Sequence, residues 1–511
     1  MTDSTRKFAH CLWNALAPAL VCSLAVTTSW AQTPPKMKMT TDIPPDITTP
    51  DKVKTRLGEL KFFDGYPDKE TVDKVYDNLD FQRGVDVFLN TLSGTSLVAF
   101  RRGMREVGCV DGTVGIYETL MDSKSLFLTP NTDTIYAMTW VDLKKGPVVI
   151  ELPPEVLGMM DDFWFHYVTD LGIVGPDHGK GGKYLFLPPG YKGEIPQGYF
   201  VVKPDTYSNL VFWRGFKVKG KVEPAVESMH KYTRIYLLSQ AANPPEQKFV
   251  NLSGKAFNTI GGNTYKFYED VNELVQEEPT ESQSPELLGQ LAAIGIQKGK
   301  PFTPDERMKK ILTDAVAVGN ATARAISYRP RDPQVYFYPG KAWSTPFVGG
   351  SYLFLGDGAR LLDARTMFFY NATGVTPAMA LQMVGKGSQY ALAFVDADKN
   401  YLDGSKTYKL TLPPNVPAAE FWSFVVYDTQ TRSELQTDQP FPAVGSNTEG
   451  LQKNTDGSYD VYFGPKAPAG KESNWIQTVP GKSWFTCLRL YSPLEPWFNK
   501  TWKPGEIELL K

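Results

Sequence analysis

The chain has 511 residues, of which 42% are hydrophobic and 13% aromatic, so it can bury the cores of two or more domains. Its 54 lysines and arginines nearly balance 56 aspartates and glutamates, which leaves a net charge of -2. This balance argues against nucleic acid or an anionic membrane as the partner, because both attract a basic surface.

The first 31 residues have the pattern of a secretory signal peptide. Arg6 and Lys7 give a basic start, hydrophobic residues follow over positions 11–26, and Ala31 marks the predicted cleavage point. We therefore predict a periplasmic or secreted protein, with an uncleaved anchor as the alternative. No later stretch is apolar over the length of a membrane span, so we predict no transmembrane span after cleavage.

Cleavage would leave only two cysteines, Cys109 and Cys487. In an oxidising compartment they could form one disulfide, provided that the fold brings them together. The alternative is a pair of buried free thiols, since free cysteine is among the most buried residue types.

An extended segment and a helical region come first in the mature chain. Residues 32–56 are rich in proline and threonine, which predicts an extended lead-in. From Asp68 to about Met104, hydrophobic residues recur at helical spacing. We therefore expect the first ordered elements to be helices.

Two later regions repeat the same order of sequence features. The stretches "TPNTDTIYAMTWVDLKKGPVVIELPP" and "SQYALAFVDADKNYLDGSKTYKLTLPP" share Tyr-Ala, Val-Asp and Leu-Pro-Pro at corresponding places. The stretches "LPPEVLGMMDDFWFHYVTD" and "LPPNVPAAEFWSFVVYDTQ" then share Leu-Pro-Pro-x-Val and Phe-Trp, which predicts a Phe-Trp strand in each copy. Each copy ends on an aromatic strand, "NLVFWRGFKV" in the first and "SWFTCLRLYSP" in the second.

This repeat predicts a mainly β protein with helical insertions. We expect two antiparallel β-sandwich or jelly-roll-like domains, joined and flanked by α-helices, because closely spaced strands with Gly and Pro turns are typical of such folds. The predicted boundaries are 1–31 for the signal peptide, 32–56 for the extended segment, 57–220 for the helical lead-in with the first β domain, 221–385 for a mainly helical connection and 386–511 for the second β domain.

The connecting region has helical spacing in several stretches. The first, "EPAVESMHKYTRIYLLSQ", predicts one helix that includes Tyr236. In "TPDERMKKILTDAVAVGNATARAIS", Thr303 is the predicted N-cap, because proline and glutamate follow it at positions typical of a helix start. We expect a last helix to be interrupted near Gly374 and Pro377.

Four stretches are specific enough to indicate a family. They are "TPNTDTIYAMTWVDL", "GIQKGKPFTPDERMKKIL", "DARTMFFYNATGVTPAM" and "LPPNVPAAEFWSFVVYDTQTRSELQTDQPFPAVGSNTEGLQ". They resemble bacterial exported proteins that pair a DUF1254 domain with a C-terminal DUF1214 domain, and the resemblance covers nearly the whole mature chain. It implies a mostly β, two-domain, exported protein, and it implies no particular reaction.

Candidate catalytic residues follow the first Phe-Trp stretch: His166 and Asp170, then Asp177 and His178 in the loop "GPDHGKGGK". At the rim of a sandwich these side chains could converge, with a histidine as general base and an aspartate that orients it. The alternatives are a hydrogen-bonded structural histidine and a solvated surface pair. The sequence has no HxH, HExxH or cysteine-pair spacing, so the strong signatures of a metal site are absent. Whether a metal or any other cofactor binds stays open.

Two polar stretches are candidates for ligand binding. The stretch "PNTDTIY" brings together Asn131, Asp133 and Tyr136, which could present polar atoms to a ligand or could cap a turn. The stretch "YDTQTRSELQTDQP" follows the second Phe-Trp strand, and there Arg432 could clamp a carboxylate or phosphate. The alternative is that Asp428 and Arg432 pair with each other.

The predicted function is hydrolysis of a small or cell-envelope-derived molecule in a cleft between the two β domains. The alternative is a non-catalytic periplasmic protein that binds a ligand or carbohydrate, because sandwiches host both kinds of function. The expected partner is therefore a small-molecule or envelope-derived ligand and not nucleic acid, and assembly into a homo-oligomer stays open.

Overall fold

The computed structural model describes residues 35–510, so the predicted signal peptide lies outside the described residues. The chain divides into two compact units between Val72 and Asp73. In the first unit, strands β1 (Lys52–Thr55), β2 (Gly58–Phe63) and β3 (Tyr66–Pro67) form a small antiparallel sheet. The prediction that helices come first was therefore wrong. Gly65, with a φ of 87°, makes the tight turn between β2 and β3 that the helical pattern did not reveal.

Two sheets of the second unit face each other and form the N-terminal sandwich. The larger sheet has the strand order β14-β4-β6-β12-β8-β9, and the smaller one has the order β11-β10-β7-β13. Alternate residues of β6 and β12, among them Ala137 and Trp213, fill the space between the sheets. The strands are β4 (Val114–Ile116), β6 (Ile135–Asp142), β7 (Val148–Leu152), β8 (Leu157–Asp162), β9 (Tyr167–Gly172), β10 (Gly182–Phe186), β11 (Phe200–Val202), β12 (Ser208–Gly215), β13 (Arg234–Leu237) and β14 (Phe249–Asn251).

Two further sheets form the C-terminal sandwich. Their strand orders are β18-β24-β20-β21 and β23-β22-β19-β25. Their shared core contains Phe424 from one sheet and Phe463 from the other. The strands are β18 (Ser388–Ala393), β19 (Tyr408–Leu412), β20 (Ala418–Asp428), β21 (Ala443–Gly445), β22 (Tyr459–Gly464), β23 (Trp475–Gln477), β24 (Trp484–Pro493) and β25 (Glu508–Leu509).

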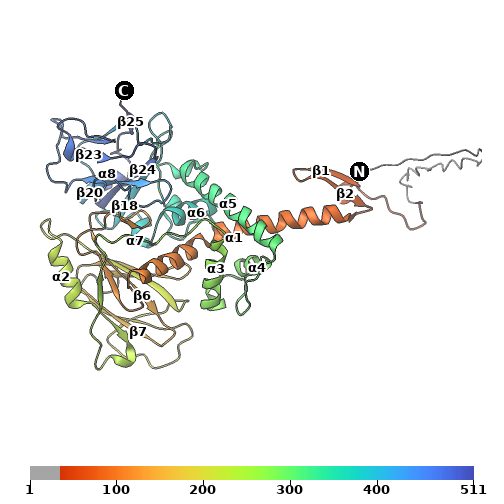
Figure 1. The fold of residues 1–511 in the computed structure, drawn as a ribbon, viewed down its shortest axis with the longest axis horizontal. Coiled ribbons are helices and arrows are strands. Elements are labelled where there is room, and N and C mark those ends of the chain that lie inside the picture. The colour runs from red at the N-terminus through yellow and green to blue at the C-terminus, as the bar shows by residue number, and fades with distance from the viewer. Residues whose placement is uncertain (1–34, 511) are drawn as a thin grey trace, which may run out of the picture. The chain divides into compact units, whose positions relative to one another are not determined.

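The two sandwiches share one strand order. Strands β6, β12 and β8 of the first occupy the positions that β18, β24 and β20 occupy in the second. In the smaller sheets the equivalent pairs β10-β11 and β22-β23 are both parallel. Figure 1 shows the C-terminal sandwich, in blue, stacked on the N-terminal sandwich. The predicted fold class, a mainly β protein with antiparallel sheets and added helices, is confirmed.

The predicted Phe-Trp strand exists in only one copy. Phe421 and Trp422 lie inside β20 as expected. Trp164 instead lies in the turn between β8 and β9, where the Asp162 carboxylate accepts hydrogen bonds from the backbone N–H groups of Trp164 and His166, both at 2.8 Å. This local acceptor favours a turn over a continued strand, so the prediction was wrong for the first copy.

Helices lie beside the two sandwiches (Figure 1). The helix expected to include Tyr236 ends at Tyr232, and Tyr236 lies in β13, where it pairs with β7. The long helix from residue 306 is capped by Asp305, whose carboxylate accepts from the Met308 N–H at 2.7 Å, and not by Thr303. The predicted interruption near Gly374 and Pro377 is confirmed.

The helices are α1 (Lys69–Glu106), α2 (Glu223–Tyr232), α3 (Lys266–Glu277), α4 (Pro285–Ala293), α5 (Glu306–Tyr328), α6 (Leu362–Asn371), α7 (Pro377–Ala380) and α8 (Glu495–Phe498). Two short strand pairs complete the fold: β5 (Ser125–Leu126) with β15 (Phe257–Asn258), and β16 (Leu355–Gly356) with β17 (Ala359–Arg360). Between residues 35 and 510, no helix has the length and apolar character that crossing a membrane requires.

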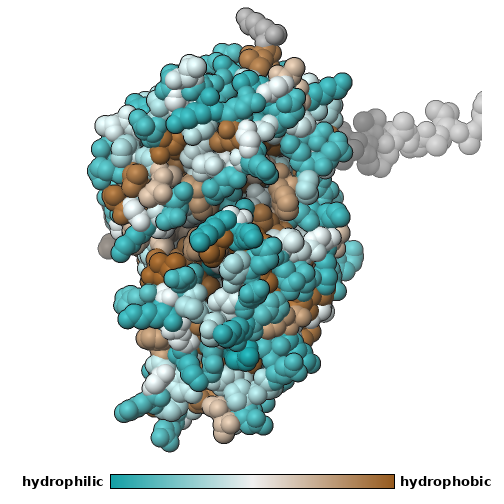
Figure 2. Space-filling model, turned by 90° about the vertical axis from the view of Figure 1, so that its left-hand side faces the viewer, coloured by the Kyte–Doolittle hydropathy of each residue, from teal (hydrophilic) through white to brown (hydrophobic). Residues whose placement is uncertain are grey.

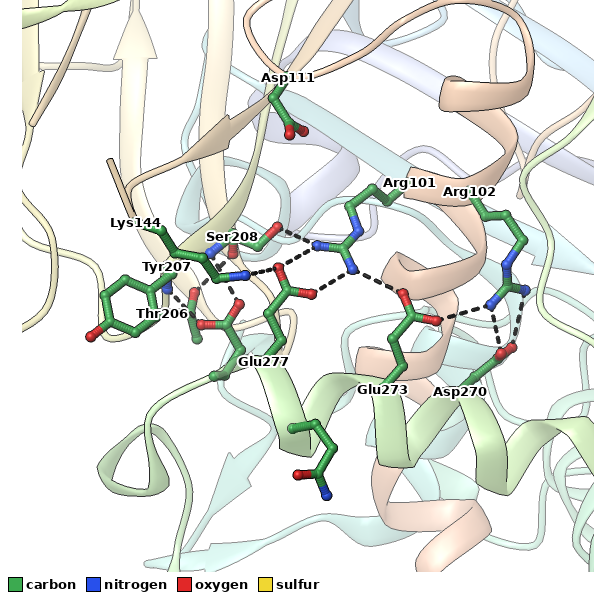
Figure 3. Close-up of polar contacts among 12 residues, drawn as sticks. Arg101, Arg102, Asp111, Lys144, Thr206, Tyr207, Ser208, Asp270, Glu273 and Glu277 are labelled. Carbon is green, nitrogen blue, oxygen red and sulfur yellow. Dashed lines mark hydrogen bonds and ion pairs between the residues drawn. The ribbon is translucent and has the colours of Figure 1, made fainter. Parts of the chain in front are cut away.

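A partly buried ion network ties α1 to α3 and to β12 (Figure 3). Arg101, which is 3% exposed, donates to Glu277 at 2.6 Å, to Glu273 at 3.0 Å and to Ser208 at 2.9 Å. The neighbouring Arg102 donates to Asp270 at 2.6 Å. Because these charges are paired with one another, the network holds the helices in place and does not leave a charge for a ligand.

Candidate functional site

A cleft opens where the two sandwiches meet the helical segment between them; we call it the central cleft. It contains about 1000 Å³ of space that no atom occupies, open solvent at its mouth included. Its walls are mostly hydrophobic, with Met159 and Phe212 on the N-terminal side and Phe347, Phe368 and Leu392 opposite. Figure 2 shows hydrophobic side chains gathered in a band across the middle of the molecule, at the level where the sandwiches meet.

The larger sheet of the N-terminal sandwich directs one row of side chains into this cleft. Tyr136 on β6 lies opposite Arg214 on β12, and Arg214 lies opposite Leu157 on β8. Directly opposed residues of an antiparallel sheet project to the same face, and all three line the cleft. The neighbouring residues Ala137 and Trp213 project into the sandwich core, so strand alternation fixes the direction of this row.

The C-terminal sandwich directs an equivalent row into the cleft. Tyr390 on β18 lies opposite Arg489 on β24, and Arg489 lies opposite Ser423 on β20. Tyr390 and Arg489 line the cleft. Because β6 and β12 occupy the same sheet positions as β18 and β24, each sandwich supplies one tyrosine and one arginine from equivalent strands.

Arg489 is paired across the junction of the sandwiches. It is 5% exposed, and its Nη2 donates to the carbonyl oxygens of Thr129 at 2.6 Å and Pro130 at 3.1 Å. The same nitrogen donates to the Tyr427 hydroxyl at 2.8 Å, and the guanidinium lies 5.2 Å from the centre of the Tyr390 ring. Since Thr129 and Pro130 precede β6, this arginine binds one sandwich to the other.

Arg214 has no such partners. It is 8% exposed, and its side chain makes no hydrogen bond or ion pair with any residue that the structure describes. An arginine keeps its proton in proteins, and a buried charge without a partner is unfavourable. The central cleft can therefore stabilise one further negative charge beside Arg214.

Asp133 is an acidic group whose charge interacts with Arg489. Its Oδ2 accepts from the Ser423 hydroxyl at 2.6 Å, which links β20 to the loop before β6. Burial raises the pKa of Asp133, although the Ser423 hydrogen bond and the positive charges of Lys217 and Arg489 oppose the rise. This carboxylate is engaged with serine and forms no ion pair with Arg214 among the described residues.

Of the predicted ligand-binding residues Asn131, Asp133 and Tyr136, only Tyr136 lines the central cleft. Fully buried Asn131 accepts from the backbone N–H groups of Asp133 at 2.9 Å and Thr134 at 3.0 Å, and it donates to the Tyr136 hydroxyl. Asn131 is thus the turn cap that the alternative interpretation described. It positions Tyr136 in the cleft wall, and ligand contact by Asp133 and Tyr136 stays a prediction.

The second predicted ligand-binding pair lies outside the central cleft. Asp428 forms an ion pair with Lys482 at 2.5 Å, and Arg432 donates through its side chain to the carbonyl oxygens of Tyr370 and Gln430. The structure thus provides separate partners for Asp428 and Arg432 and shows no ion pair between their side chains within residues 35–510.

The four predicted catalytic residues are not brought together in one cluster. His166 pairs with Asp162 at 3.1 Å. Asp177 is buried and accepts from the backbone of Gly172 and Gly181 and from the Tyr184 hydroxyl, as a structural turn would require. Exposed His178 lines a second, more open cleft.

Asp170 is the predicted catalytic residue that lines the central cleft. The hydroxyls of Thr376 and Tyr167 donate to its carboxylate, at 2.5 and 3.2 Å. Burial raises the pKa of Asp170, and these two hydrogen bonds oppose the rise. Its position and pKa fit a carboxyl group that can hold a proton beside a ligand.

Sequence reasoning missed the two arginines. Each is the single charged residue in a mostly apolar and aromatic strand, Arg214 in "NLVFWRG" and Arg489 in "WFTCLRLY". Because charged residues are rarely buried without a partner, an arginine at the same place in both repeats was a usable signal. The strands were noted only for their aromatic residues.

Cys109 and Cys487, the two cysteines among residues 35–510, are buried free thiols, as one of the two interpretations held. Cys487 lines the central cleft, and burial raises the pKa of its thiol to about 11, which leaves little reactive thiolate near neutral pH. Within the described part of the chain, no group of three or more His, Cys, Asp or Glu side chains could hold a metal ion.

Comparisons with solved structures find relatives of the fold. The VPA0106 protein of Vibrio parahaemolyticus is 18% identical, with a TM-score of 0.52 over 84% of this chain and 100% of its own. A putative uncharacterized protein of Burkholderia cenocepacia is 12% identical, with a TM-score of 0.37 over 86% of this chain and 96% of its own. No curated protein matches. The first likeness supports the arrangement of the fold alone.

Family comparisons match both sandwiches. Residues 112–237 match the family described as DUF1254, and residues 387–495 match the family described as "Protein of unknown function (DUF1214)". These matches cover the strands that carry the two tyrosine and arginine pairs. The chain therefore carries a DUF1254 domain followed by a DUF1214 domain, as its sequence resemblance indicated.

Proposed function

We propose that the protein binds a small organic anion with a hydrophobic body in the central cleft. The observation that carries the proposal is Arg214, a buried guanidinium that lines the cleft without a protein partner among the described residues. A guanidinium binds carboxylates, phosphates and sulfates through paired hydrogen bonds. The hydrophobic walls suit the body of such a ligand, because small-molecule sites are mostly apolar with a few placed polar groups.

The two arginines have different parts in this proposal. Arg214 contacts the anionic group directly. Arg489 adds positive charge from the opposite wall while its Nη2 stays bound to the loop before β6. Tyr136 and Tyr390 flank the anion with aromatic rings and hydroxyls, so the anion would be held between the two repeated rows.

The experiment is isothermal titration calorimetry with octanoate, octyl phosphate and neutral 1-octanol. We expect both anions to bind and the neutral alcohol to bind much more weakly. Arg214→Met should weaken octanoate binding by about 30-fold or more, because truncating one partner of a buried charged contact costs about 2–5 kcal/mol. Arg331→Met is the matched control, since the Arg331 side chain is 87% exposed and is not part of the cleft lining.

Equal binding of octanoate to the wild type and to Arg214→Met would contradict the proposal. So would anions that bind no better than 1-octanol. A circular dichroism spectrum and an unfolding curve for each variant separate lost binding from lost folding.

Hydrolysis is a second candidate function, and Asp170 favours it. Its carboxyl group lines the cleft and burial raises its pKa, so it could act as a general acid toward a leaving group. The substrate would be an ester or related derivative of a small or cell-envelope-derived organic acid. Asp170→Asn should abolish turnover of such a substrate and leave product binding intact; turnover that persists in this variant would exclude the role.

We also propose that the protein is exported to the periplasm or secreted. The basic and then hydrophobic pattern of residues 1–31 supports this proposal. Native mass spectrometry of the protein from an expressing bacterium would show a mature chain that begins at Gln32, and would also give the number of chains per assembly. An intact N-terminus in the recovered protein would contradict export by cleavage.

A further inference from the structure

A second cleft adjoins the central cleft; we call it the basic cleft. It contains about 1770 Å³ of space outside the atoms, open solvent included. The two clefts share Leu157, Gly387 and Ser388 in their linings. The two clefts therefore lie next to each other, with these residues at their common boundary.

Three lysines in the lining give this cleft its charge: Lys217, Lys219 and Lys386. None of them forms an ion pair with a residue of the described chain. Two acidic residues, Glu155 and Glu420, also line the cleft, so the lysines outnumber them. Positive charge of one sign in a concave surface raises the local concentration of anions.

The wall between the clefts carries hydroxyl groups without partners. Ser388 and Tyr491 lie opposite each other on β18 and β24, in the row next to Tyr390 and Arg489. Each is 2% exposed, and neither hydroxyl has a hydrogen-bond partner in the part of the chain that the structure describes. Buried hydroxyls normally find a partner, so these two are polar groups of the wall that the fold leaves without a hydrogen bond.

Two of the positively charged residues are close neighbours in the chain. Arg214 lies near the end of β12 and Lys217 lies three residues later, so their Cα atoms are at most about 11 Å apart. Both residues can therefore serve one elongated ligand.

We infer that the ligand is a dianion: one negatively charged group binds at Arg214, and a second binds at the lysines of the basic cleft. This inference rests on the proposed function and names its ligand class. A hydrophobic chain between two carboxylates, or between a carboxylate and a phosphate or sulfate, matches the two charged ends and the apolar walls between them.

The test compares octanedioate with octanoate, which have the same carbon chain and differ in one carboxylate. In calorimetric titrations the wild type should bind octanedioate at least tenfold more tightly than octanoate. A variant that combines Lys217→Met, Lys219→Met and Lys386→Met should lose this preference and keep its octanoate affinity. The matched control combines Lys300→Met, Lys310→Met and Lys466→Met, three exposed lysines outside both clefts, and should keep the preference.

The outcomes separate the two proposals. If the wild type binds both acids equally, or octanoate more tightly, the dianion inference is wrong and the proposed function stands. If the preference survives in the basic-cleft variant, the lysines do not hold the second group and the inference is also wrong. If neither acid binds, the proposed function fails and the dianion inference fails with it.

Discussion

Arg214 and Arg489 occupy equivalent positions in two sandwiches of the same strand order, yet their surroundings differ. Arg489 donates to two carbonyl oxygens and a tyrosine hydroxyl, so its charge is used to hold the sandwiches together. Arg214 has no partner of this kind among the described residues and faces the central cleft. The comparison shows how a repeat can divide one residue type between two tasks: one copy stabilises the junction, and the other copy is left for a ligand.

The strongest test of this comparison is Arg489→Met. The substitution removes the donor to the carbonyl oxygens of Thr129 and Pro130 and to the Tyr427 hydroxyl, and of these two carbonyls only Pro130 keeps another donor, the Tyr427 hydroxyl. We expect the free energy of unfolding to fall by about 3–5 kcal/mol, as for other buried charged contacts that lose one partner. Urea unfolding followed by tryptophan fluorescence measures the change, and a loss below about 1 kcal/mol would show that the junction does not depend on this arginine.

Asn131→Ala tests the support of the first row. The substitution removes the acceptor for the N–H groups of Asp133 and Thr134 and the donor to Tyr136. We expect a loss of about 2 kcal/mol in the same urea unfolding experiment, because buried donors are left unpaired. Asn499→Ala removes a similar turn from the surface and should cost less; equal losses would show that burial of Asn131 does not matter.

Asp161→Asn tests a buried ionisable group in the N-terminal sandwich. Asp161 is fully buried, one of its oxygens accepts from the Val375 N–H at 3.0 Å, and the other has no partner in the described chain. Burial raises the pKa of this carboxyl well above its ordinary value, and the nearby Asp162 and Asp170 raise it further. The folded state therefore binds a proton that the unfolded state has released, so wild-type stability falls as pH rises above about 4.

The asparagine variant lacks this titration. We expect its melting temperature, relative to that of the wild type, to rise from pH 4 toward neutral. Differential scanning calorimetry across this range measures the margin between the two melting temperatures. A margin that shrinks as pH rises would show that folding lowers the pKa of Asp161 and would contradict the expected upward shift.

Arg214→Met should change stability least. The variant replaces a buried charge without a partner by a side chain of similar length, so we expect unfolding free energy to stay within about 1 kcal/mol of the wild type or to rise. Urea unfolding of this variant beside Arg489→Met gives the comparison directly. A loss as large as that of Arg489→Met would mean that Arg214 is structural and would remove the difference between the two copies.

The sandwiches were predictable because their signals are local. Alternation in "YAMTWVD" and "YALAFVD" and the Leu-Pro-Pro turns recur in both halves, and period-two patterns with turn residues report directly on strands. The Phe-Trp turn at Trp164 was not predictable from the same pattern, because a single carboxylate of Asp162 decides it. The strand at Tyr236 also depends on a distant partner, β7.

The site was predictable only in part for a related reason. The stretch around Asn131 was identified because its polar residues are adjacent in sequence. The rows that contain Arg214 and Arg489 arise from strand register across residues far apart in the chain. The pattern of a single segment does not show which residues of a distant strand lie opposite it. The arginine that both repeats share is the one local sign of these rows.

The bonds from Arg489 and Tyr427 to the carbonyls of Thr129 and Pro130 reach further than the cleft. They give the buried cation of the C-terminal sandwich two carbonyl acceptors from a loop of the other half, and residues of both halves share one hydrophobic core, among them Phe212 and Leu392. The two sandwiches therefore depend on each other as the subunits of an obligate heterodimer do, although one polypeptide contains both. Neither half could be exchanged for an unrelated sandwich unless the new partner also reproduced that loop.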